Sequence, residues 1–110
     1  MQIIRGDNDV FKFKRTDMDG KVITQKPDKM YLTVKENIYQ EKALIQKTLE
    51  NGIRFEDETY YVDFVPEDTD ELSFGTYVYD IEVITEGIKK TIEKGEFIID
   101  GEVTHKENEV

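Results

Sequence analysis

Apolar and polar residues alternate in short runs along most of the chain, and a period of two is typical of strands that bury one face. The clearest run covers residues 76–85, where every second side chain from Tyr77 to Val83 is apolar or aromatic. The same pattern recurs in residues 29–35. We predict further strands at residues 10–16, 21–24, 44–49, 53–55, 59–65, 88–93 and 96–100.

Turn-forming residues separate these runs. Asp19-Gly20 and Asn51-Gly52 are typical of two-residue hairpin turns, because these residue types tolerate the positive φ angles that such turns need. Glu86-Gly87 and Lys94-Gly95 predict two further turns, and the acidic residues 56–58 predict another. Strands joined in this way favour antiparallel pairing.

Two segments depart from the strand pattern. Residues 36–44 predict a loop that leads into a strand, and Pro66 with the acidic residues after it predicts one helical turn over residues 66–72. The sequence therefore predicts an all-β fold, an immunoglobulin-like antiparallel β-sandwich of about seven to nine strands. This single domain is expected over residues 1–104, followed by a polar C-terminal tail at 105–110.

Leu72, Gly75 and Tyr77 are spaced like the residues of a corner between two sheets. The leucine would fill the core, the glycine would permit a sharp entry, and the tyrosine would begin the next strand. In immunoglobulin-like sandwiches, a tyrosine at such a corner donates a hydrogen bond to the backbone of the preceding loop. We therefore interpret these three residues as a structural corner rather than as a ligand site.

Charge and composition narrow the classes of function. The chain has 25 acidic and 15 basic residues, a formal charge of −10, so long-range repulsion disfavours nucleic acid and anionic membranes as partners. The sequence has neither a signal-peptide pattern nor an apolar run long enough to span a bilayer, and we expect synthesis in the cytoplasm.

Few residues offer catalytic or metal-binding chemistry. The sequence has no cysteine, and its single histidine, His105, falls in the polar tail, so we expect no enzyme activity, no metal and no cofactor. Asp17, Asp19 and Gly20 are similar to the start of a calcium loop, but the remaining ligands are missing at the required spacing, which favours a hairpin turn. The acidic residues 56–58 and 67–71 could bind calcium weakly, but a solvated turn and a helical turn are the preferred interpretations.

Two further patterns suggest a binding surface. Tyr60, Tyr61 and Tyr79 could line a sugar-binding face, because aromatic rings stack on the apolar faces of sugars, although alternation would place some of them in the core. The tripeptide Arg5-Gly6-Asp7 matches a cell-adhesion motif, but it is short enough to occur by chance. Neither pattern by itself predicts a function.

Several segments together resemble a known group of proteins. They are Arg5-Gly-Asp, Phe11-Lys-Phe-Lys-Arg-Thr-Asp, Asp19-Gly, Tyr31-Leu-Thr-Val-Lys, Gln46-Lys-Thr-Leu-Glu-Asn-Gly-Ile, and the stretch from Glu67 to Val83. The chain resembles small proteins encoded in phages and prophages of Firmicutes, and it is similar to the N-terminal sandwich domain of baseplate upper proteins. Such domains dock on a virion platform.

The resemblance implies a noncatalytic virion component of the tail or baseplate, or an accessory structural protein, that acts by protein–protein assembly. Its implied partners are other virion proteins, with a homo-oligomer as a further possibility, and its implied location is the virion. The alternative function is a carbohydrate-binding module for bacterial surface polysaccharide. The absence of tryptophan weighs against that alternative.

Overall fold

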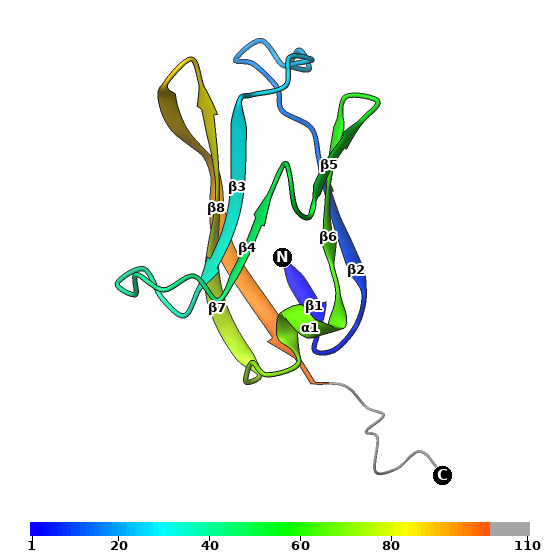
Figure 1. The fold of residues 1–110 in the computed structure, drawn as a ribbon, viewed down its shortest axis with the longest axis vertical. Helices are drawn as coiled ribbons and strands as arrows, with labels where there is room; N and C mark the ends of the chain where they lie inside the picture. Colours follow the sequence, from blue (N-terminus) through cyan, green and yellow to red (C-terminus); the bar gives the residue numbers. More distant parts are fainter. Residues whose placement is uncertain (102–110) are drawn as a thin grey trace.

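The computed structural model describes residues 1–101 and contains two β-sheets (Figure 1). Its elements are β1 (Gln2–Ile4), β2 (Asp9–Phe13), β3 (Lys29–Lys35), β4 (Ile45–Thr48), β5 (Ile53–Glu56), β6 (Thr59–Phe64), α1 (Pro66–Thr69), β7 (Gly75–Thr85) and β8 (Ile88–Asp100). The larger sheet has the order β1-β8-β7-β3-β4, and the smaller has the order β2-β6-β5. The prediction of an all-β protein is confirmed.

The two sheets enclose one hydrophobic core built from the alternating faces of their strands. Met30, Leu32 and Val34 of β3 have no exposed surface, and every second residue of β6 is buried in the same way. Phe64 of β6 and Phe97 of β8 connect the sheets, with ring centroids 5.5 Å apart. Since each fully buried apolar side chain contributes about 1.5–3 kcal/mol, this core is the main stabilising element of the fold.

The N-terminal strand β1 was not predicted, and it changes the pairing pattern. β1 pairs with β8 in parallel, with Gln2 opposite Ile98 and Ile4 opposite Asp100. The expectation of a wholly antiparallel sandwich is therefore wrong at this edge, although every other strand pair is antiparallel. Ile3 enters the core from β1, which explains why this short strand is held against the sheet.

The predicted turn at Lys94-Gly95 is wrong, because β8 continues through both residues. The apolar positions change phase between Ile92 and Phe97, and this change suggested two strands. A β-bulge opposite Ile81 and Glu82 absorbs the change without a turn. Gly95 lies opposite Tyr79, and a Cβ atom there would be only 3.3 Å from the tyrosine ring, so the glycine makes room for the ring.

Two predicted hairpins also differ from the structure. The turn at residues 17–20 forms, with the Gly20 amide donating to the Asp17 carbonyl oxygen. The return segment pairs only briefly, through the antiparallel bridge of Thr16 with Val22 and hydrogen bonds from the Asp17 amide to Lys21 and from the Ile23 amide to Arg15, so it is shorter than the predicted strand 21–24. Asn51-Gly52 does not close a hairpin, since β4 belongs to the larger sheet and β5 to the smaller. It is a crossover between the sheets.

The predicted helical turn is present as α1, which leads from β6 toward β7. The Asp68 carboxylate accepts a hydrogen bond from the Val65 amide at 2.8 Å, and the Asp70 amide donates to the Pro66 carbonyl oxygen at 3.0 Å. Within residues 1–101 no helix has the length and apolar character needed to cross a membrane.

Candidate functional site

Leu72, Gly75 and Tyr77 lie together at the connection between α1 and β7. The Tyr77 hydroxyl donates a 2.7 Å hydrogen bond to the Ser73 carbonyl oxygen, and its ring is buried against the core. Leu72 is half-buried and packs against the same core. Gly75 has a φ angle of +148°, which side chains rarely permit, so a glycine is needed where the chain enters β7.

Side-chain hydrogen bonds and one ion pair connect this corner to both sheets. Thr69 is fully buried, and its hydroxyl accepts a 2.8 Å hydrogen bond from the Gly6 amide. The Lys47 ammonium of β4 lies 2.8 Å from the Asp68 carboxylate, and both side chains are mostly shielded from solvent. Because the Asp68 carboxylate also accepts from the Val65 amide, one side chain links α1 to β4 and to the end of β6.

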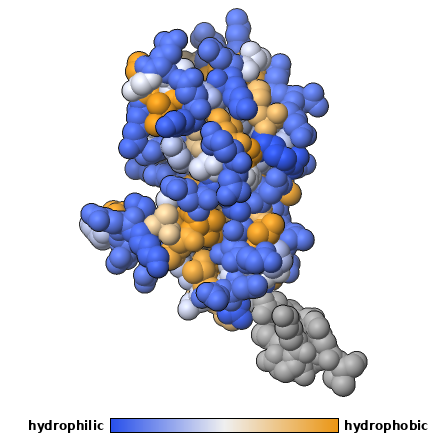
Figure 2. Space-filling model, viewed as in Figure 1, coloured by the Kyte–Doolittle hydropathy of each residue, from blue (hydrophilic) through white to orange (hydrophobic). Residues whose placement is uncertain are grey.

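A groove opens beside the corner. Its lining residues are Glu36, Leu44 and the segment 71–77, which includes Leu72, Phe74 and Tyr77. Figure 2 shows apolar surface between the body of the molecule and the projecting loop that follows β3. Glu36 and Glu71 are exposed, and the groove lining includes no lysine or arginine. The groove therefore combines apolar side chains with two carboxylates, and its lining is polar and apolar in similar measure.

Part of one strand lacks a partner beside this groove. β7 pairs with β8 along its whole length, but its pairing with β3 begins only at Val78. Gly75, Thr76 and Tyr77 thus have a neighbouring strand on one side only. Backbone at such an edge is a template for an added strand, so the groove could receive an extended peptide.

The Arg5-Gly6-Asp7 tripeptide forms the turn after β1. The Asp7 amide donates to the Ile4 carbonyl oxygen at 3.1 Å, and Gly6 has a φ angle of +81°. The Arg5 guanidinium carbon lies 4.2 Å from the centroid of the Phe74 ring, a cation–π contact. The tripeptide therefore packs against the corner, which gives it a structural role in the fold.

The three tyrosines proposed for a sugar-binding face do not lie on one surface. Tyr60 is fully buried, and Tyr79 is 9% exposed, so both belong to the core. Only Tyr61 is half-exposed on the outer face of the smaller sheet. The expectation that alternation places some of them in the core is confirmed for Tyr60 and Tyr79, because β6 and β7 turn these two side chains inward, and the three do not form one sugar-binding face.

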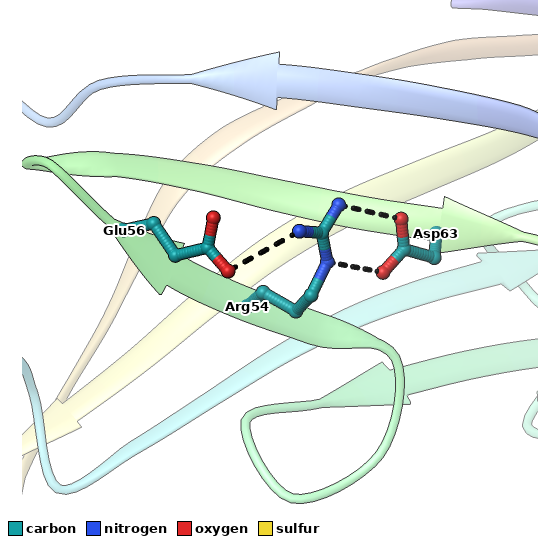
Figure 3. Close-up of polar contacts among 3 residues, drawn as sticks. All are labelled: Arg54, Glu56 and Asp63. Carbon is teal, nitrogen blue, oxygen red and sulfur yellow. Dashed lines mark hydrogen bonds and ion pairs between the residues drawn. The ribbon is translucent and has the colours of Figure 1, made fainter.

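Arg54, Glu56 and Asp63 form an ion-pair cluster on this outer face (Figure 3). The Arg54 guanidinium donates two hydrogen bonds to Asp63, at 2.7 and 3.0 Å, and one to Glu56 at 3.4 Å. The hydrogen bond from Arg54 lowers the pKa of the Asp63 carboxyl. Arg54 also lies over the Tyr61 ring, 4.9 Å from its centroid. Since Arg54 already has two carboxylate partners, we interpret the cluster as cross-strand pairing that stabilises the smaller sheet.

The acidic residues that could have bound calcium do not form a metal site in the described residues. One Asp17 carboxylate oxygen accepts hydrogen bonds from the amides of Asp19 and Lys21, both at 2.9 Å, which is the arrangement of a turn. In the part of the chain that the structure describes, no three His, Cys, Asp or Glu side chains are grouped to hold a metal ion. His105 lies outside the described residues.

The structure brings the three predicted corner residues together and adds a groove wall that sequence reasoning missed. Glu36 and Leu44 come from a loop about thirty residues earlier in the chain, and no local pattern connects them to Tyr77.

A comparison with protein-family models gives no match for this chain, and a comparison with curated proteins gives none either.

Proposed function

We propose that this chain is a noncatalytic structural component of a phage or prophage virion, either of the tail or baseplate or an accessory protein, that binds other virion proteins. The observation that carries the assembly role is the groove beside the Leu72–Tyr77 corner, which combines partly exposed apolar side chains with two carboxylates. The virion setting rests on the sequence resemblance to the N-terminal domain of baseplate upper proteins.

We also propose that the two sheets form an immunoglobulin-like sandwich. In immunoglobulin domains, the strands named B, E and D share one sheet, while G, F and C share the other. The orders β2-β6-β5 and β8-β7-β3 correspond to these two sets, with β4 added beside β3. The Tyr77 hydrogen bond to Ser73, at the start of the strand equivalent to F, supports the same assignment.

The side chains that line the groove indicate which kind of partner segment would bind there. Leu44, Leu72 and the half-exposed Phe74 offer apolar contact, and two carboxylates stand at the rim. A partner segment with an apolar side chain beside lysine or arginine complements both features, and opposite charge speeds correct docking. The unpaired stretch 75–77 of β7 allows that segment to bind as an extended strand.

Co-expression with the products of neighbouring genes tests the proposal. We expect a head or tail gene product to co-purify with the chain, and a Glu36→Lys, Glu71→Lys double variant to lose it. Glu86→Lys is the matched control, because Glu86 is exposed in the distant β7–β8 turn. Binding that is equal in all three proteins would exclude the groove as the interface.

Light scattering of the purified chain separates self-assembly from binding of other virion proteins. A concentration-dependent mass that the double variant abolishes would identify a second copy as the groove partner. A monomer whose gene neighbourhood lacks head and tail genes would contradict the virion proposal. Saturable heat on titration with host cell-wall polysaccharide would instead favour the carbohydrate-binding alternative.

A further inference from the structure

The segment that follows β2 and the beginning of β8 lie at the end of the molecule opposite α1 (Figure 1). A second cavity lies between these two segments. Its volume is about 210 Å³. The side chains that matter for binding are three cations, Lys14, Arg15 and Lys90, one carboxylate, Glu93, and an apolar wall of Phe13, Ile23 and Ile92. The formal charge of this lining is +2, from three positive groups and one negative group.

This local charge contrasts with the net charge of −10 on the whole chain. Lys14, Arg15 and Lys90 make no ion pair with any carboxylate in the described residues 1–101. The one carboxylate of the cavity already has a partner, because Glu93 accepts a 2.7 Å hydrogen bond from the Tyr79 hydroxyl. Three cations thus share a small cavity without an anion from the described chain to balance them.

A buried hydroxyl behind this cavity also lacks a partner. Tyr60 is fully buried, and its hydroxyl makes no hydrogen bond of good geometry with the described part of the chain, although the Arg15 side chain is close enough to interact with it. The Tyr60 ring stacks on Phe13 of the cavity wall, with centroids 5.1 Å apart. Burial raises the pKa of this phenol, and the neighbouring Arg15 acts in the opposite direction. An unsatisfied buried polar group is uncommon in folded proteins and needs an explanation.

We infer that this cavity binds the phosphate group of a small phosphate monoester. A monoester carries a charge of about −1.5 to −2 near pH 7, which balances the lining, and Arg and Lys are the usual donors to phosphate oxygens. The volume lies below the roughly 300–1,000 Å³ of pockets for drug-sized ligands, so the ligand is small. Its organic part packs on Phe13, Ile23 and Ile92.

Nuclear magnetic resonance titration of the full chain tests this site, with sodium chloride holding the ionic strength constant. The probes are glycerol phosphate, inorganic phosphate and acetate. We expect glycerol phosphate to bind saturably, to shift the amide signals of residues 14–16 and 90–93, and to bind at least about tenfold more tightly than acetate. Equal affinity for glycerol phosphate and inorganic phosphate would show that the cavity does not recognise an organic part and would overturn the monoester assignment.

Variants connect binding to these side chains. Arg15→Gln and Lys90→Gln should each weaken glycerol phosphate binding at least about fivefold. Lys29→Gln is the control, because Lys29 is an exposed lysine on β3 outside the cavity, and its affinity should stay within about twofold of the original. Lys90 is exposed, so its variant remains informative if Arg15→Gln does not fold. Shifts that do not saturate, or that weaken equally in all three variants, would overturn the inference.

Discussion

The two ends of the molecule differ in whether their polar side chains have hydrogen-bond or ion-pair partners. At the corner end, Tyr77 donates to Ser73, Thr69 accepts from Gly6, and the carboxylate of Asp68 binds both Lys47 and the Val65 amide. At the end with the cationic cavity, three cations have no carboxylate partner and the Tyr60 hydroxyl has no hydrogen bond among the described residues. Both ends belong to the same two sheets.

This difference separates structural from binding roles. A buried polar group with partners contributes about 0.5–1.5 kcal/mol per hydrogen bond, whereas one without partners costs about 1–3 kcal/mol. The corner end therefore stabilises the fold through its polar groups. At the cavity end the cations are exposed or half-exposed, and the buried group without a partner is the Tyr60 hydroxyl, which should weaken the fold. Substitutions at the two ends should consequently have opposite effects on stability.

Asp68→Ala should give the largest effect, a loss of about 3 kcal/mol in the free energy of unfolding. The substitution leaves Lys47 shielded and unpaired, and it removes the acceptor of the Val65 amide. Urea unfolding followed by circular dichroism measures the change. Asp70→Ala is the control and should cost little, since Asp70 is an exposed neighbour. Equal losses in both variants would show that this ion pair does not anchor the corner.

Tyr77→Phe should cost about 1 kcal/mol, because the Ser73 carbonyl oxygen loses its donor while the buried ring stays in place. The same unfolding experiment measures it. A variant of unchanged stability that no longer binds a co-expressed partner would contradict the structural role of the hydroxyl. It would make Tyr77 a binding residue of the groove instead.

The corner could be predicted from sequence because its parts are local. Leu72, Gly75 and Tyr77 lie within six residues, and the Tyr77 partner is only four residues away. The strands β3, β6 and β7 were predictable for a similar reason, since each carries its own alternation. Local pattern is sufficient where one element determines its own buried face.

The remaining features depend on contacts between distant residues. The alternation of β8 breaks at its bulge, so one strand was predicted as two. Asn51-Gly52 has a hairpin signature, yet the neighbouring strands join different sheets because each finds a better partner elsewhere. The cationic cavity combines residues 13–16 with residues 90–93, and no spacing rule connects segments so far apart.

Glu93→Gln tests the one carboxylate in the cavity lining, which accepts a hydrogen bond from the Tyr79 hydroxyl. Burial, followed by the hydrogen bond and charge of Glu93, raises the pKa of Tyr79 to about 12 from the ordinary 10.0. The stability linked to this proton is fully present below pH 10 and is lost as the pH rises toward 12.

Removal of the Glu93 charge should lower the Tyr79 pKa but leave it above 10.0, because burial is the larger cause. At neutral pH the amide still accepts the hydrogen bond, so stability should change by only about 0.5 kcal/mol. Ultraviolet absorbance of the phenolate during an alkaline titration measures the pKa, with Tyr79→Phe identifying the signal. An unchanged Tyr79 pKa would show that Glu93 is not its partner.

Tyr60→Phe should have an effect of the opposite sign to Tyr77→Phe. The phenylalanine keeps the stacking on Phe13 and the contact with Phe55, whose ring centroid lies 4.5 Å away, and it removes a buried hydroxyl that has no partner. We expect unchanged stability or a gain of up to about 1 kcal/mol. A loss equal to that of Tyr77→Phe would mean that the hydroxyl is hydrogen-bonded in solution. The two ends of the molecule would then no longer differ in how they satisfy their buried tyrosines.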